Sequence, residues 1–229
     1  MIKKEITLSD QKQYWEHHKN RRSFDHTVVS LFSRQRIDFL KRYLDTAEII
    51  SAFDYGCGDG FSCYYMNEFI PHIEGGDVSE LMLSNNPLAK NLLHVLDGEH
   101  LPFSDNSFDM VYCWEVLHHV EHPNIVLKEI ARVASRYVVV FEPNSYNLAQ
   151  FLFGFFRKEE RGTLRFNVRY LKRLARLSDL QIIHSSNVGW IFPNVTPTWI
   201  VPILEKLPYE FPFLPISCCL IAQKAKVIR

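Results

Sequence analysis

A glycine-rich segment that begins with an acidic residue is the part of the sequence best suited to ligand chemistry. It reads Phe53-Asp54-Tyr55-Gly56-Cys57-Gly58-Asp59-Gly60, and five of the nine glycines lie between positions 56 and 76. Glycines at a turn between a strand and a helix let the backbone bend tightly and approach a ligand, with the helix amides facing it. The segment therefore predicts a ligand-binding turn, although an incidental glycine turn would look similar.

Two further acidic residues follow apolar runs at positions where a bound adenosine could be held. Asp77 lies about 20 residues after the glycines, where a carboxylate can accept hydrogen bonds from both ribose hydroxyls. Asp97-Gly98 follows a third apolar run, where an acid can meet the amino group of adenine. Each of these residues alone could be a helix cap or a turn residue. Together, Asp54, Asp77 and Asp97 would line one edge of a sheet.

Adjacent histidines follow a fourth apolar run. His118 or His119 could act as a general base toward a hydroxyl group of an acceptor. The alternative is that one imidazole packs under the sheet while the other caps a helix or contacts the cofactor. With Glu115 they could also bind a divalent ion on one helical face, but we assign no metal ligands.

The elements that must position these residues alternate between short apolar runs and amphipathic stretches. Strands are predicted at residues 49–53, 72–76, 92–96, 108–113 and 137–141. Helices are predicted at 61–68, from a cap at Ser79, and from Pro123 to about residue 135. Such alternation is typical of βαβ crossovers and predicts a parallel sheet covered on both faces.

The flanking regions complete the predicted architecture. Residues 9–45 favour two helices, the first capped by Ser9 or Asp10. A helix at 167–177 and strands at 180–186 and 216–223 end the chain. Between those strands lies an aromatic insertion that holds six of the eleven prolines, with a short helix expected near 199–206. Its Trp190, Phe192 and Trp199 could form a wall of the acceptor pocket or merely cover the end of the sheet.

The bulk properties favour a single cytoplasmic domain of 229 residues. We divide it into an N-terminal helical cap (1–45), a cofactor-binding core (46–145) and an acceptor-side region (146–229). Lys+Arg and Asp+Glu balance at 26 each, which gives no electrostatic reason to expect nucleic acid. No apolar stretch reaches the roughly 18 residues of a membrane span, although peripheral contact stays possible. The five cysteines include no C-x-x-C pair and are predicted to be reduced thiols.

Taken as a set, these motifs resemble class I S-adenosylmethionine-dependent methyltransferases. The closest resemblance is to the type-11 methyltransferase domain shared with ubiquinone and menaquinone biosynthesis enzymes. The acid-x-G-x-G-x-G motif of the family is matched by Asp54, Gly56, Gly58 and Gly60. The later motifs resemble residues 77–83, 97–109 and 115–120. Residues 133–136 replace the proline-glycine-glycine turn that the family often has before its fifth strand.

The resemblance implies a fold, a cofactor and a set of site residues. The fold is a Rossmann-like seven-stranded α/β sheet, mostly parallel with a reversed last strand and with helices on both faces. The cofactor is S-adenosyl-L-methionine, and His118 and His119 are the candidate catalytic residues. Related quinone O-methyltransferases carry a Glu-x-x-Glu-His metal set, of which Glu115 and His119 match while His118 replaces the second Glu. The predicted cofactor contacts are Asp54, Gly56, Cys57, Gly58, Gly60, Asp77, Val78, Asp97, Gly98 and Trp114.

The predicted function is methyl transfer to a small-molecule acceptor, such as a lipid, a quinone precursor or a sugar-type metabolite. A non-catalytic scaffold that keeps the fold and the cofactor site is the alternative from a different class. A nicotinamide dinucleotide is a weaker rival, because its G-x-G-x-x-G fingerprint would need a glycine where Phe61 stands.

Overall fold

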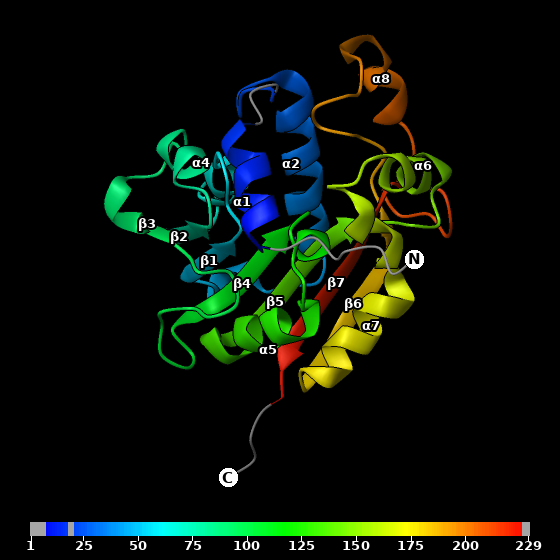
Figure 1. Cartoon of the computed structure of the whole chain (residues 1–229). Helices are drawn as coiled ribbons and strands as arrows, with labels where there is room; N and C mark the ends of the chain where they lie inside the picture. The colour runs from blue at the N-terminus through cyan, green and yellow to red at the C-terminus, as the bar shows by residue number, and fades with distance from the viewer. Residues whose placement is uncertain (1–7, 18–20, 226–229) are drawn as a thin grey trace, which may run out of the picture.

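A seven-stranded sheet forms the centre of the computed structural model, which describes residues 8–17 and 21–225. The strand order is β3-β2-β1-β4-β5-β7-β6 (Figure 1). Strands β1 to β5 pair in parallel, and β7 runs antiparallel to both β5 and β6. The predicted fold class with its reversed last strand is therefore confirmed. The strands are β1 Ser51–Tyr55, β2 His72–Asp77, β3 Leu93–Val95, β4 Phe108–Trp114, β5 Ala134–Pro143, β6 Leu180–Val188 and β7 Ser217–Lys224.

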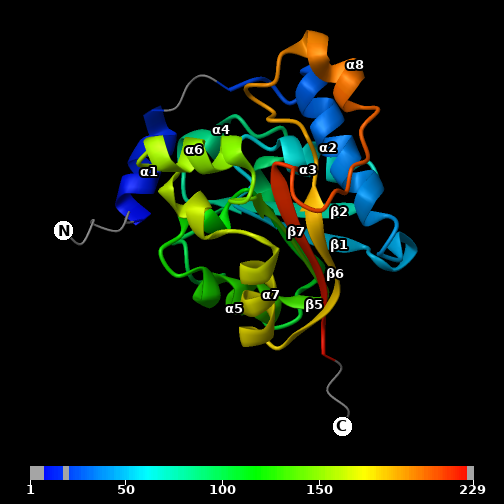
Figure 2. The same ribbon diagram turned by 90° about the vertical axis from the view of Figure 1, so that its right-hand side faces the viewer.

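Helices cover both faces of the sheet (Figure 2). They are α1 Leu8–His17, α2 Thr27–Leu40, α3 Phe61–Met66, α4 Glu80–Ser84, α5 Pro123–Val133, α6 Leu148–Phe156, α7 Val168–Leu177 and α8 Val201–Leu204. The described residues also form five 3-10 helices: η1 Thr46–Glu48, η2 Lys90–Leu92, η3 Leu117–His119, η4 Arg161–Arg165 and η5 Thr198–Ile200. Within this described part of the chain, no helix combines the length and apolarity that crossing a bilayer demands.

The sequence signals at the helix ends had mixed outcomes. The predicted cap at Ser79 is confirmed, because its hydroxyl accepts a hydrogen bond from the Met82 amide at 3.3 Å. Pro123 begins α5 as predicted. The caps proposed for α1 are wrong: that helix already spans Leu8, so Ser9 and Asp10 lie inside its first turn. Helix α6 and η4 were not predicted at all.

The core consists of two apolar layers, one on each face of the sheet. On one face, α5 and α7 pack against alternate strand residues that include Val138 and Val140. On the other face, α2 and α3 pack against Val139 and Phe141. This continuous apolar pattern is what a parallel sheet covered on both sides requires. Each fully buried aliphatic side chain contributes about 1.5–3 kcal/mol, so the sheet gives rigid support to the loops at its edge.

The connection after α6 packs closely on the loop that carries the two histidines. Gly162, in η4, lies against the backbone carbonyl of His118, and an added methyl group would overlap that oxygen. Because this neighbour is backbone, it cannot turn away as a side chain would.

We therefore expect Gly162→Ala to lower the free energy of unfolding by about 1–3 kcal/mol, the usual cost of overpacking. Urea unfolding measures it. Lys158→Ala, an exposed change in the same connection, is the control and should stay within about 0.5 kcal/mol. Equal stability of Gly162→Ala and the wild type would show that η4 can shift to make room for the added methyl group.

Candidate functional site

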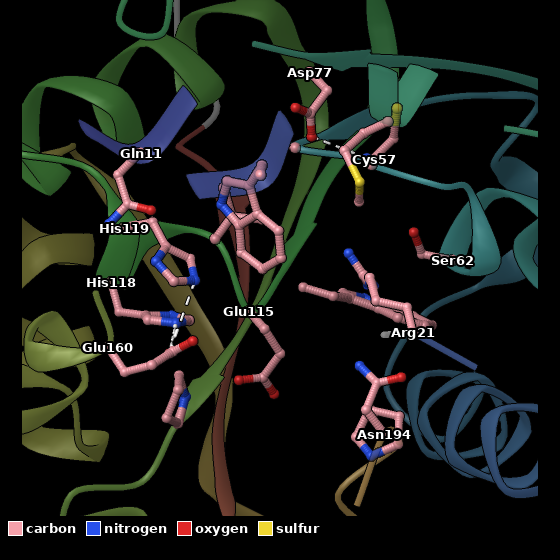
Figure 3. A pocket seen from close by; sticks show the side chains of 18 of the residues that line it. Gln11, Arg21, Cys57, Ser62, Asp77, Glu115, His118, His119, Glu160 and Asn194 are labelled. Atoms are coloured by element: carbon pink, nitrogen blue, oxygen red, sulfur yellow. Dashed lines mark hydrogen bonds and ion pairs between the residues drawn. The ribbon is translucent and has the colours of Figure 1, made fainter. Parts of the chain in front are cut away.

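A cavity of about 510 Å³ lies at the carboxyl ends of the parallel strands. It begins where the strand order reverses, between β1 and β4, which is the usual ligand position in open α/β sheets. Figure 3 shows side chains from several parts of the chain pointing into it. Its walls come from the glycine turn, the ends of β2 and β4, helices α1 and α6, and residues 192–195. Of the predicted site residues, those that line it are Gly56, Cys57, Gly58, Asp77, Val78, Gly98, Trp114, His118 and His119.

The glycine turn presents backbone to the cavity. Gly56 and Gly58 have φ angles of 76° and 50°, in the left-handed region that side chains disfavour. The amides of Gly56 and Cys57 both donate to the carbonyl oxygen of Gly76, at 2.7 and 3.0 Å, which ties the turn to β2. Gly60 also has a positive φ, but a methyl group there would overlap Asn86, and Gly60 does not line the cavity. Gly60 thus serves the packing of α3.

Asp77 joins the turn to the next helix and faces the cavity. Its Oδ2 accepts from the Gly58 amide at 3.0 Å, and its Oδ1 accepts from the Ser79 amide at 2.9 Å. Burial raises the pKa of the Asp77 carboxyl above its ordinary value, and these backbone donors oppose that shift. A carboxylate has about four acceptor positions, so Asp77 can also accept from ligand hydroxyls.

The other two predicted acids do not face the cavity, which corrects the picture of three acids along one open edge. Asp54 is 1% exposed beneath the turn, where the Ser62 hydroxyl and the Cys63 thiol, at 3.2 Å, donate to it. Burial raises the pKa of Asp54 to about 7 despite these donors. Asp97 is exposed and accepts from the His100 amide at 3.1 Å, so it closes a turn. Its neighbours Leu96 and Gly98 reach the cavity instead.

A buried carboxylate of β5 fixes the loop that carries the histidines. Glu142 is fully buried and accepts from the amides of Val116, Leu117 and His118 at 2.9, 2.6 and 3.2 Å. Its Oε2 also lies 2.7 Å from Nδ1 of His118. Charge-assisted bonds of this kind are about twice as strong as neutral ones. Glu142 therefore sets both the path of η3 and the orientation of the His118 ring.

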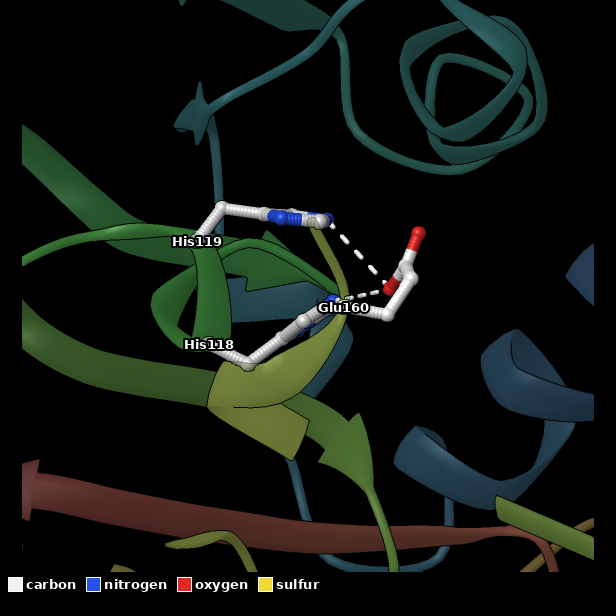
Figure 4. Close-up of side chains that lie close together, drawn as sticks. All are labelled: His118, His119 and Glu160. Atoms are coloured by element: carbon white, nitrogen blue, oxygen red, sulfur yellow. Dashed lines mark ion pairs between the residues drawn. The ribbon is translucent and has the colours of Figure 1, made fainter. Parts of the chain in front are cut away.

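His118 lies between two carboxylates, and Figure 4 shows the second of them. Its Nε2 is 3.4 Å from Oε2 of Glu160. Burial alone would lower the pKa of His118, but the charge of Glu142 and the hydrogen bonds to both carboxylates outweigh it and raise the pKa to about 10. His118 is thus a buried imidazolium with both ring nitrogens engaged. It has no site to accept a proton, which argues against the general-base role predicted for it.

His119 is the neutral member of the pair. Burial, followed by the positive charge of His118, lowers its pKa to about 3. The ring lines the cavity and meets Trp15 of α1 edge-on, with centroids 5.3 Å apart. This arrangement agrees with the alternative in which one histidine packs under the sheet, and a contact of the other with the cofactor stays a prediction.

The metal alternative built on Glu115 is wrong in its ligand set. Glu115 and the histidines do not share a helical face: Glu115 has a φ of 61° and pairs with Arg36 and Ser217. Among the residues that the structure describes, His118, His119 and Glu160 instead have ligand atoms within 4.8 Å of one another. In this structure both imidazole rings pair with the Glu160 carboxylate.

Sequence reasoning missed Glu142, Glu160 and Arg21. The Arg21 side chain lines the cavity, with Nε 3.2 Å from Oδ2 of Asp59 and its guanidinium 5.4 Å from the Trp15 ring. None of the three lies in a motif. Glu142 was hidden in an apolar strand, and the other two come from segments far from the glycine turn in sequence.

Comparison with known proteins agrees with this geometry over the core of the chain. Residues 53–139 match a family model described as a methyltransferase domain. The tRNA U34 carboxymethyltransferase of Nautilia profundicola is 37% identical over 34% of this chain and 28% of its own length. The ubiquinone biosynthesis O-methyltransferase of Hydrogenovibrio crunogenus is 28% identical over 55% of each chain. The matches thus span about a quarter to a half of these relatives.

Solved structures extend the likeness to most of the chain at the level of the fold. An S-adenosylmethionine-dependent methyltransferase from Mesorhizobium loti superposes with a TM-score of 0.61 at 18% identity, covering 88% of this chain and all of that one. One from Aquifex aeolicus gives a TM-score of 0.56 at 16% identity, covering 82% and 89%.

The charge of His118 makes a testable contribution to stability. Its folded pKa of about 10 lies above its ordinary value of 6.5. The contribution is therefore complete below about pH 6.5 and is lost as the pH rises through 10. We expect His118→Gln to be less stable than the wild type near neutral pH. The difference between their free energies of unfolding should become smaller near pH 10.

Urea unfolding of both proteins at the two pH values measures this narrowing. His122→Gln removes a half-exposed surface imidazole and serves as the control, for which we expect no comparable narrowing. If the wild type and His118→Gln differ in free energy of unfolding by the same amount at both pH values, His118 is not a buried cation.

Proposed function

We propose that the protein transfers the methyl group of S-adenosylmethionine to a small-molecule acceptor, because residues 53–139 match a methyltransferase-domain model and lie within the seven-stranded sheet described above. One observation carries the proposal. A single cavity brings the glycine turn and Asp77 together with His119 and an apolar wall. That combination provides a cofactor half and an acceptor half within one space.

The cofactor half fits a nucleoside joined to an amino acid. Gly56, Cys57 and Gly58 would hold the methionine end, where Arg21 supplies a positive charge for a carboxylate. Asp77 and Val78 would hold the ribose, and Gly98 would border the adenine. Trp114 lines the same cavity, and its buried Nε1 has no hydrogen-bond partner among the described residues. Asp54 and Gly60 would act indirectly, by fixing the turn.

The chemistry demands little of the protein beyond alignment. S-adenosylmethionine supplies a methyl group already activated by its sulfonium charge, so proximity and orientation account for most of the acceleration. A group with a pKa of about 3 is a weak base near pH 7, so we assign His119 to orienting the acceptor through a hydrogen bond. His118 holds Glu160 in place from the other side.

The acceptor half combines apolar walls with a polar end. Phe153 of α6 and Phe192 and Val195 of the insertion provide apolar surface, and His119 and Glu160 provide polar atoms. This pattern suits a lipid or quinone precursor better than a sugar. Residues 192–195 thus support the predicted pocket wall, but Trp199 does not, since it is 75% exposed and does not line the cavity. One relative acts on tRNA by its name, yet this chain has no net charge to favour a nucleic acid.

All three regions of the chain contribute to this cavity. Gln11 and Trp15 come from the N-terminal cap, Asp77 from the core, and Phe153 and Ser217 from the acceptor-side region. A site assembled in this way supports the division into one domain with three cooperating parts.

Cofactor binding is the first test of the proposal. We expect S-adenosylmethionine to bind with micromolar affinity, about −8 kcal/mol. Asp77→Ala should weaken binding by roughly 1.5–3 kcal/mol, the scale of hydrogen bonds to a charged group. Asp97→Ala is the matched control, because it makes the same change after the next strand but at an exposed residue outside the cavity. Calorimetric titration of the three proteins measures this.

Two results of these titrations would oppose the proposal. Binding of NAD without binding of S-adenosylmethionine would replace methyl transfer by a nicotinamide chemistry. Equal loss in Asp77→Ala and Asp97→Ala would mean that the ribose is not held at the end of β2. Asp77→Asn, which keeps the side-chain shape, guards against a folding defect in the alanine variant.

Transfer itself is tested by incubating the protein with isotopically labelled methyl donor and a cell extract, followed by mass spectrometry. We expect a labelled small molecule in the lipid-soluble fraction, and much less of it with His119→Ala at unchanged cofactor affinity. Cofactor binding without labelling of any molecule would favour the non-catalytic scaffold, and labelled RNA would move the acceptor to nucleic acid.

A further inference from the structure

Helix α6 has its apolar side on the outside of the molecule. Leu148, Phe151, Leu152 and Phe155 recur at the spacing of one helical face, and Phe156 extends it. All five are exposed, Leu148 by 70% and Phe156 by 76%. The protein side of the helix carries Gln150 and Gly154, which are buried. A methyl group on Gly154 would overlap Thr163, so α6 is seated closely and cannot simply turn over.

The exposed stripe continues onto the loop that leads into β7. The Asn147 side-chain amide, at the start of α6, donates to the Leu214 carbonyl oxygen at 2.5 Å. Phe213 and Leu214 are exposed by 70% and 57%. In Figure 1, α6 lies at the margin of the molecule next to this loop. We define the α6 face by these seven apolar residues: Leu148, Phe151, Leu152, Phe155, Phe156, Phe213 and Leu214.

The exposed charged residues that directly follow α6 are basic. Helix α6 contains no charged residue. The first two residues after it, Arg157 and Lys158, are exposed. The acidic residues that follow are withdrawn: Glu159 is half-buried, and Glu160 points into the cavity toward His118. An apolar stripe bordered by basic residues is the composition of helices that lie in a membrane interface.

We propose that the α6 face docks on an anionic lipid bilayer, with its phenylalanines among the acyl chains and Arg157 and Lys158 at the headgroups. A protein partner of unknown kind would explain the apolar stripe but gives no reason for the basic border. The docked surface also adjoins the site, because Gln150 and Phe153 of α6, and Arg157 directly after it, line the cavity. An amphipathic acceptor would thus enter from the lipid phase. That link to the acceptor rests on the proposed function, whereas the docking does not.

Co-sedimentation of the full chain with vesicles tests the docking. We expect binding to vesicles of phosphatidylglycerol mixed with phosphatidylcholine, and weaker binding to phosphatidylcholine alone. The double variant Phe155→Ser, Phe156→Ser should bind roughly tenfold more weakly or worse, since two large apolar contacts are lost. Lys158→Gln should reduce binding to the anionic vesicles and leave binding to the neutral ones unchanged.

Ile50→Ser is the matched control. Ile50 is 64% exposed but precedes β1, at the opposite end of the sheet from α6. The Ile50→Ser variant should bind vesicles as strongly as the wild type does. Circular dichroism and S-adenosylmethionine titration of every variant keep a folding defect, or a failure of the proposed function, distinct from a failure of docking.

Three outcomes would overturn the proposal. One is that the wild type binds neither kind of vesicle. The second is that the serine double variant sediments as well as the wild type. The third is that the wild type is a dimer that the double variant breaks, without any vesicle binding; the α6 face would then be covered by a second copy of the chain.

Discussion

The carboxylate of Glu142 is the interaction on which the architecture of the site depends. It directly follows the apolar run 137–141 of β5, and it meets three backbone amides and an imidazolium in a fully buried position. A charge held there is stable only if its partners stay in place, because an unpaired buried carboxylate costs several kcal/mol. The loop after β4 consequently has one strongly preferred path, and that path brings His119 to the cavity.

Buried charged groups also link the site to the N-terminal helical cap and to the start of β7. His118 pairs with both Glu142 and Glu160, so the segment after α6 is held by the same network. Arg36 of α2, 1% exposed, pairs with Glu115 and donates to Ser217 at 3.0 Å. Removing one partner of a buried ion pair is strongly destabilising, because it leaves the other charge buried without a partner. Here these ion pairs fix the relative position of segments that are far apart in sequence.

The sequence predicted the sheet and the glycine turn at the cavity well, because both depend on local patterns. Apolar runs marked the strands, and the glycines with Asp77 marked a turn whose geometry needs those residue types. The prediction failed where the outcome depends on tertiary contacts. Asp97 has the same position relative to its predicted strand as Asp77, yet only Asp77 reaches the cavity. The partners of Glu142 and Glu160 are set by the folded chain, and no periodicity in the sequence reveals them.

The placement of β7 between β5 and β6 constrains the order in which the sheet can form. Strand β6 precedes β7 in the chain but pairs with β7 alone, so it has no neighbour in the sheet until residues 217–224 arrive. Before that moment β5 is an open edge, with a run of β-branched residues that could pair with another chain. Closing the sheet late, through contacts distant in sequence, slows folding. During synthesis this half of the molecule would therefore depend on protection from aggregation until its last strand is in place.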